Sequence, residues 1–290
     1  PEDDSRPGKK ALGMNDHAFR NLWLKLALLV LLAFGVQLAT AQNPEVLEET
    51  GTHRLVKHAA GETWVPANPA RVVSLHVIFN EALAALDVIP VAASFKRPND
   101  VIDGLAPLHA VDTGVLADLG EEERAFIPRH MPPGFAEALD LGEDQPNLEA
   151  LLAVEPDLIL GHSKRDADIY EQLSRIAPTV LLDFDIDPRD LVMDIGAVLG
   201  VQAQARARVA AYDACLEEAE GILDDVLGER SIAVLKINIR ELKVKGDAHR
   251  SGLVLYRHLG LTPAPFVPLG DKDAKLSFEV VPELTSDVLI

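Results

Sequence analysis

Several basic side chains follow short apolar runs that are typical of buried strands. Arg165 stands four residues beyond the run 156–161, and Lys96 and Arg97 follow the run that ends at Ala93. In parallel sheets, ligands bind at the carboxyl ends of the strands, so these cations are candidates for contacting anionic oxygens. A planar guanidinium such as that of Arg165 suits bidentate oxygen recognition.

Lys236 and Arg240 occupy comparable places around a later run, 231–238. The chain has 27 basic and 46 acidic residues, a formal charge of -19, which repels anions at long range. A cleft lined by the basic residues would focus a local positive field against that repulsion. The alternative for each cation is an ordinary solvated surface charge.

Two histidines also follow predicted strands. His76 comes after the first buried run and His162 after the run 156–161, so both are candidates for a metal or haem iron. A histidine in a loop is more often not a ligand. Three alternatives therefore remain for these histidines: a free-metal site, a haem site, or no contact with iron.

The elements that would position these side chains alternate between strands and helices. A hairpin is expected over 53–65 with Gly61 at its turn, since glycine tolerates positive φ. Strand and helix signals then alternate, which predicts an α/β protein with a parallel sheet covered on both faces. The strands are expected at 71–75, 88–93, 156–161 and 178–184, and the helices at 80–86, 148–154 and 169–177.

One long helix is predicted over Val201–Leu227, which contains no proline and only Gly221 as an interior glycine. At 1.5 Å per residue it would reach about 40 Å, enough to tie two lobes together. Cys215, the single cysteine, is expected to be partly buried beside its apolar stripe. The stripe is predicted to contain Val209, Tyr212, Leu216, Ala219, Leu223 and Val226.

Four segments are expected along the chain. They are 1–41, an upstream segment plus signal peptide; 42–187, a ligand-binding lobe; 188–228, with the long linker helix; and 229–290, a second lobe. Strands at 231–238 and 242–245 and a helix at 252–259 should build that second lobe. The run 287–290 reads as the start of another strand, which predicts an incomplete, truncated lobe.

The beginning of the chain has the pattern of a secretory leader. Basic Arg20 and Lys25 precede the apolar run 26–36, and the small residues of 39–41 predict cleavage after Ala41. The apolar run is shorter than the roughly 20 residues of a spanning helix. We expect Met14 to be the true start, a periplasmic location and no lipid anchor, because no cysteine follows the leader. A retained membrane anchor is the alternative.

Other function classes find little support in the sequence. The net charge disfavours nucleic-acid partners. Nucleotide-binding glycine loops, the H-E-x-x-H metalloprotease pattern and the G-x-S-x-G nucleophile elbow are absent from the sequence. We therefore expect a binding protein and not an enzyme.

Five motifs together resemble the ferric-siderophore, haem and vitamin B12 binding proteins of ABC importers, in particular the iron-siderophore branch. The resemblance covers roughly residues 55–290. It rests on GETWVPANPARVV at 61–73, NEALAAL at 80–86, QPNLEAL at 145–151, EPDLILG at 155–161 and YEQLSRIAPTV at 170–180.

This resemblance implies two α/β lobes with parallel-rich sheets, joined by one long backbone helix, with a ligand in the cleft between them. The ligand would be a ferric siderophore delivered by a monomer to the membrane permease, with no cofactor. Arg165 would contact its anionic oxygens, and Glu81 would dock onto the permease. Arg257 stands where the second lobe of the family presents another glutamate. Haem or vitamin B12 binding, or a truncated non-functional copy, are the alternatives.

Overall fold

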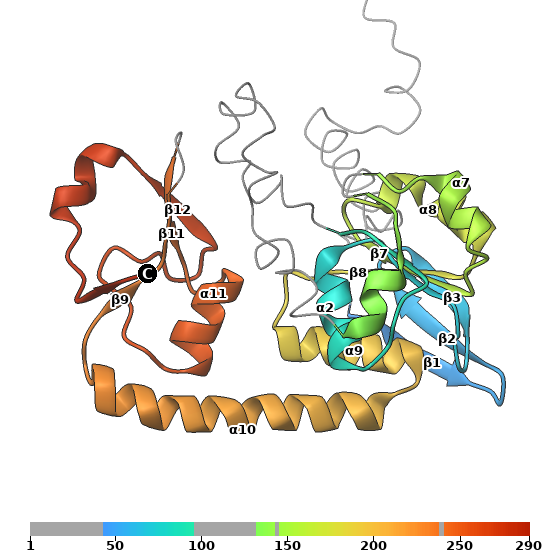
Figure 1. The fold of residues 1–290 in the computed structure, drawn as a ribbon, viewed down its shortest axis with the longest axis horizontal. Coiled ribbons are helices and arrows are strands. Elements are labelled where there is room, and N and C mark those ends of the chain that lie inside the picture. The colour runs from blue at the N-terminus through green and yellow to red at the C-terminus, as the bar shows by residue number, and fades with distance from the viewer. Residues whose placement is uncertain (1–42, 96–131, 143–144, 238–240) are drawn as a thin grey trace, which may run out of the picture. The chain divides into compact units, whose positions relative to one another are not determined.

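The structure is a computed structural model that describes residues 43–95, 132–142, 145–237 and 241–290 (Figure 1). Gln42–Ile290 forms one compact unit. We call the part of it that precedes the long helix the first lobe, and residues 231–290 the second lobe.

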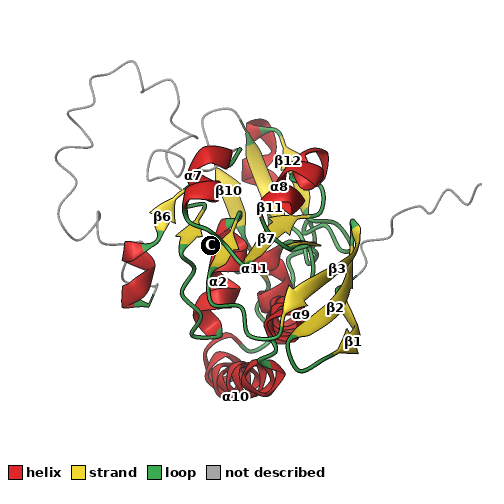
Figure 2. Cartoon of the chain, turned by 90° about the vertical axis from the view of Figure 1, so that its right-hand side faces the viewer, coloured by secondary structure: helices red, strands yellow, loops and turns green. Residues whose placement is uncertain are grey.

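The first lobe opens with a three-stranded antiparallel sheet, whose strands lie side by side in Figure 2. The predicted hairpin is confirmed, with β2 and β3 joined at Gly61, whose φ is +127°. Buried His58 ties the hairpin to the neighbouring sheet, because its Nδ1 accepts from the Leu181 N–H at 3.2 Å and its Nε2 lies 2.9 Å from Thr63 Oγ1. The strands are β1 (Glu45–Glu49), β2 (His53–His58) and β3 (Gly61–Pro66).

The centre of the first lobe is a five-stranded sheet in the order β6-β5-β4-β7-β8, in which all neighbouring strands are parallel. The predicted α/β class with a parallel sheet is thus confirmed. Its strands are β4 (Val72–Ser74), β5 (Ala92–Ala93), β6 (Leu139–Asp140), β7 (Leu158–His162) and β8 (Thr179–Leu182).

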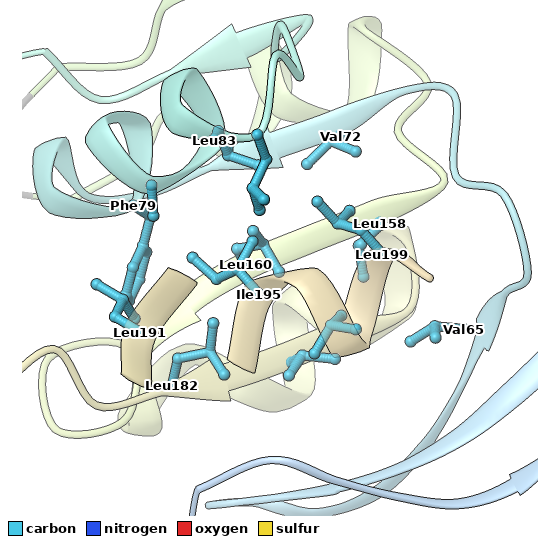
Figure 3. Packing of buried hydrophobic residues seen from close by; sticks show 14 of the residues in the cluster. Val65, Val72, Phe79, Leu83, Leu158, Leu160, Leu182, Leu191, Ile195 and Leu199 are labelled. Carbon is cyan, nitrogen blue, oxygen red and sulfur yellow. The ribbon is translucent and has the colours of Figure 1, made fainter. Parts of the chain in front are cut away.

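Helices cover both faces of this sheet. Successive side chains of a strand point to opposite sides, so the apolar strands present side chains to helices on each face. On one face, Leu158 and Leu160 of β7 pack against α2 (Val77–Ala85) and α9 (Pro188–Leu199) (Figure 3). On the other face, Ile159 packs with α7 (Leu148–Ala153) and α8 (Tyr170–Ile176). Short 3₁₀ turns lie at Pro133–Glu137 and Ala167–Ile169.

Helix α9 has clear start and stop signals. The Asp187 side chain accepts from the Arg189 N–H as N-cap, Pro188 is the first helical residue, and Gly200 ends the helix with φ +79°. Its apolar residues Leu191 and Ile195 belong to the core of the first lobe.

The long helix is confirmed as α10 (Gln202–Leu227), 26 residues. Ala205 near its start lies in the first core, whereas Leu216 and Leu223 pack with the second lobe. The predicted stripe is wrong at its end, because Val226 is exposed while Leu227 packs instead. Cys215 is exposed, not partly buried as expected, since it lies beside the packed stripe and not on it.

The second lobe contains two small sheets. β10-β11-β12 is antiparallel, and β13 pairs in parallel with β9, as the strand-like run 287–290 predicted. A short helix and a π-helical turn take the place of the single helix expected at 252–259. The elements are β9 (Ile232–Ala233), β10 (Leu235–Ile237), β11 (Leu242–Lys245), α11 (Arg250–Gly252), the π-helix Leu253–His258, β12 (Asp273–Leu276), a 3₁₀ turn at Phe278–Glu283 and β13 (Val288–Leu289).

Among the described residues, no helix combines the length and the apolar character that crossing a bilayer requires.

Candidate functional site

The carboxyl ends of β4, β7 and β8, three neighbouring strands, bring together residues that are far apart in the sequence. The Phe184 ring stacks on His76 with 4.2 Å between centroids and lies 4.4 Å from the His162 ring. Arg165 and Asp166 stand three and four residues after His162. We call these five residues, His76, His162, Arg165, Asp166 and Phe184, the strand-end cluster.

His76 holds a structural position within this cluster. It is the N-cap of α2, and its Nδ1 accepts from the Ile78 N–H at 3.2 Å. Burial, together with the positive charge of Arg165, lowers its pKa to about 4. The imidazole is therefore neutral at pH 7.

His162 has one ring nitrogen engaged. Its Nδ1 accepts from the Arg165 N–H at 3.0 Å, so the neutral ring carries its proton on Nε2. That Nε2 is buried and has no hydrogen-bond partner within the described ranges. Burial also lowers the His162 pKa. The cluster thus contains a neutral imidazole with a donor still to be satisfied.

Arg165 joins the ends of β4 and β7. Its Nε donates to Asp166 Oδ1 at 2.9 Å, and its guanidinium also donates to the Leu75 carbonyl. Asp166 is buried and accepts from the His162 N–H at 2.7 Å. The Arg165 side chain keeps 28% exposure, so it stabilises the cluster and still reaches solvent.

A pocket of about 680 Å³ begins beside the cluster, with Phe184 in its wall. The first lobe contributes the residues between β8 and α9 and the first turns of α9, and the second lobe contributes residues around α11 and the π-helix. Four cations line it: Arg189, Arg250, Arg257 and Lys272. Carboxylates line it as well, so its charge is mixed.

Most of these cations have close carboxylate partners. Lys272 Nζ lies 2.6 Å from Asp185, and an Arg257 Nη2 lies 2.9 Å from Asp247. The exception is Arg250, whose Nη2 is 3.8 Å from Glu81 on α2. Its Nη1 is buried and has no hydrogen-bond partner in the described part of the chain. Partial desolvation of Glu81 on its packed side raises its pKa, and the charge of Arg250 partly offsets that shift.

A cluster of polar side chains that we call the polar junction includes three residues of the pocket wall, Asp187, Arg189 and His258. His258 Nε2 lies 2.7 Å from Asp187 Oδ2, and its Nδ1 lies 3.0 Å from the Tyr212 hydroxyl. Arg189 donates to Asp187 at 2.8 Å and to Asp213 at 3.2 Å. Burial raises the pKa of Asp187, but the hydrogen bonds from Arg189 and His258 outweigh it and lower that pKa to about 2. The junction joins the first lobe, α10 and the second lobe.

The structure brings His76, His162 and Arg165 together as the strand-end rule predicts, and Arg257 lies in the pocket wall. Glu81 lies on α2 with 60% of its side chain exposed. Lys236 is exposed on β10 and does not line the pocket. The candidates Lys96, Arg97 and Arg240 lie outside the described residues.

Sequence reasoning missed Phe184, Arg189, Arg250 and Lys272. Arg250 follows β11, but β11 lies in an antiparallel sheet, so the rule for parallel strand ends that applies to Arg165 could not have found it. In the described ranges, no group of three or more His, Cys, Asp or Glu side chains could hold a metal ion.

Comparison with known proteins gives a family match. The model of the family described as "periplasmic binding protein" matches residues 130–290. The ferric-anguibactin-binding protein FatB of Vibrio anguillarum is 28% identical over 79% of this chain and 65% of FatB. The ferric enterobactin-binding periplasmic protein FepB of Escherichia coli is 30% identical over 70% of this chain and 56% of FepB. The chain thus spans less than two thirds of either relative.

Solved structures share the fold. A FhuD fold-family periplasmic binding protein from Bacillus subtilis superposes with a TM-score of 0.62 at 21% identity, covering 79% of this chain and 76% of that one. Staphylococcus aureus SirA, solved with staphyloferrin B, gives 0.59 at 23% identity, covering 81% of this chain and 74% of SirA.

Proposed function

Because this chain belongs to the periplasmic binding protein family, we propose that it captures a ferric siderophore outside the cytoplasm and delivers it to the permease of an ABC importer. The observation that carries the proposal is the pocket of about 680 Å³ with cations from both lobes in its wall. Ferric siderophores present anionic oxygens around the metal, which guanidinium and ammonium groups recognise. The ligands of FatB and FepB, ferric anguibactin and ferric enterobactin, support the same class.

The binding residues of the proposal come from two places. Arg165 and His162, whose Nε2 has no hydrogen-bond partner among the described residues, approach the ligand from the strand-end cluster. Arg189, Arg250 and Lys272 approach it from the pocket wall. Because Asp185 and Asp187 hold Lys272 and Arg189 in place, the ligand meets cations that are already oriented. Pre-orientation lowers the entropy cost of binding.

Glu81 is the proposed docking residue for the permease, together with Arg257 in the second lobe. The exposure of Glu81 supports this role, because more than half of its side chain on α2 is accessible to solvent. The Arg257 side chain is also half exposed. It forms an ion pair with Asp247, so the surface around it is less acidic than it would be with a glutamate at this position. Binding, and not catalysis, is the role proposed for the chain as a monomer.

Titration calorimetry of the unit that starts at Gln42 tests the proposal. We expect saturable binding of ferric citrate, ferric enterobactin or a ferric hydroxamate at micromolar concentration or tighter, and no binding of iron-free chelators of matched charge. Binding of haemin or cyanocobalamin alone would contradict the siderophore assignment. A folded protein that binds none of these probes would contradict a solute-binding role of this pocket.

Arg165→Ala is expected to weaken binding by roughly tenfold to a hundredfold, because a hydrogen bond to a charged group contributes about 1.5–3 kcal/mol. The variant also leaves buried Asp166 without its cation, so its unfolding midpoint in urea should fall. Lys164→Ala is the matched control. It removes the same charge from the same loop, and its ammonium is exposed and lies 3.4 Å from Asp185. Equal affinities for the two variants would remove Arg165 from the site.

A further inference from the structure

Arg250 belongs to two surfaces at once. It is the first residue of α11 and lines the pocket, and its guanidinium also lies 3.8 Å from the Glu81 carboxylate on α2 of the first lobe. One side chain of the second lobe therefore contacts both the proposed ligand site and the proposed docking residue.

The contact between Arg250 and Glu81 is weak by its geometry. The distance of 3.8 Å between Nη2 and Oε2 is near the outer limit of an ion pair and too long for a hydrogen bond. Glu81 is 60% exposed, so water screens the attraction. Such a pair is easily exchanged for a better one.

Arg250 also has unused donor capacity. Its Nη1 is buried and lacks a hydrogen-bond partner within the described ranges, and a buried donor without an acceptor is unfavourable. An anionic oxygen in the pocket would satisfy this donor and, as a closer and less solvated charge, would compete with Glu81 for the guanidinium.

We propose that ligand capture takes Arg250 away from Glu81, so that loading the pocket releases the docking carboxylate. In the empty protein, Arg250 holds Glu81 by an intramolecular contact, and in the loaded protein Glu81 is available to the permease. The coupling is reciprocal: if loading the pocket strengthens docking of Glu81 by some factor, docking of Glu81 strengthens ligand binding by the same factor. This inference rests on the proposed function, because it needs an anionic ligand in this pocket.

A double-mutant cycle on binding affinity tests the exchange without the permease. Glu81→Gln removes the competitor and should tighten the binding of ferric enterobactin or ferric citrate about two- to fivefold, the range expected for a partly exposed pair. Arg250→Gln should weaken it about tenfold. Adding Glu81→Gln to Arg250→Gln should then change nothing, because the shared partner is gone.

Glu171→Gln controls for the loss of a negative charge, since Glu171 is exposed on α8 and outside the pocket. It is expected to leave the affinity unchanged. If Glu81→Gln tightens binding equally with and without Arg250, the exchange is contradicted while the binding function stands. If the wild-type chain binds none of ferric citrate, ferric enterobactin and a ferric hydroxamate, both the binding function and the exchange fail. Circular dichroism of each variant confirms that it is folded.

Discussion

Gly252→Ala is expected to destabilise the second lobe by about 3 kcal/mol or more, the upper range for overpacking against atoms that cannot move. A Cβ at this position would overlap the Gly246 carbonyl and lie 3.2 Å from the Asp247 Cα. Backbone atoms cannot rotate out of the way as a side chain can. The turn 246–252 would have to open.

That turn also places His249 and Arg250 in the pocket wall, so Gly252→Ala should lose ligand affinity together with stability. Urea unfolding and calorimetric titration measure the two effects. Gly221→Ala is the matched control, because a Cβ there meets nothing within 4 Å. In the interior of α10 it should instead stabilise the protein by about 0.5–1 kcal/mol. A loss below about 1 kcal/mol for Gly252→Ala would contradict the close packing of this turn.

The first lobe was largely predictable because its signals are local. The runs around Val72 and Leu158 are short, apolar and separated by helical patterns, and such strands form parallel sheets. Helix α10 followed from the absence of helix breakers. Helix α9 was not predicted, although Asp187, Pro188 and Gly200 are ordinary start and stop signals of a helix. The prediction assigned its residues to the inter-lobe segment 188–228 without a helix of their own.

The candidate site was predictable only where a topological rule applies. His76, His162 and Arg165 converge because the carboxyl ends of neighbouring parallel strands share one edge of the sheet. The contact of Glu81 with Arg250 depends on how two separately built lobes meet. Local patterns contain no information about that arrangement. Phe184 was predicted to lie inside the strand 178–184. In the structure β8 ends at Leu182, so Phe184 lies beyond the strand and its ring stacks on His76.

Buried His58 and half-buried Asp194 should give the stability of the protein opposing pH dependences. Burial lowers the pKa of His58 to about 4, and burial together with the nearby Asp190 raises the pKa of Asp194 to about 7. Between pH 4 and 6.5 the unfolded chain binds more protons at His58, so that contribution to stability falls as the pH falls. Between pH 3.8 and 7 the folded chain binds more protons at Asp194, so that contribution rises as the pH falls.

The two contributions are similar in size. From pH 7.5 to pH 4.5, His58 should cost about 2.5 kcal/mol and Asp194 should return about 2–3 kcal/mol. Because the two contributions oppose each other in the wild-type chain, variants are needed to separate them. His58→Gln is expected to lose less stability on acidification than the wild type. Asp194→Asn is expected to lose more stability on acidification than the wild type. At pH 7.5, Asp194→Asn should be the more stable of the two variants.

Urea unfolding of both variants and the wild type at pH 4.5, 6 and 7.5 measures these slopes. His53→Gln controls for removing an imidazole from the exposed start of the same hairpin. The Nδ1 of His58 accepts from Ala60 N–H and Leu181 N–H, so protonating it breaks the contact between the hairpin and β8. Acid should therefore loosen the hairpin first, and hydrogen exchange at Leu181 should accelerate before exchange in β7. Equal protection of both strands at pH 4.5 would contradict a role of His58 in holding the two sheets together.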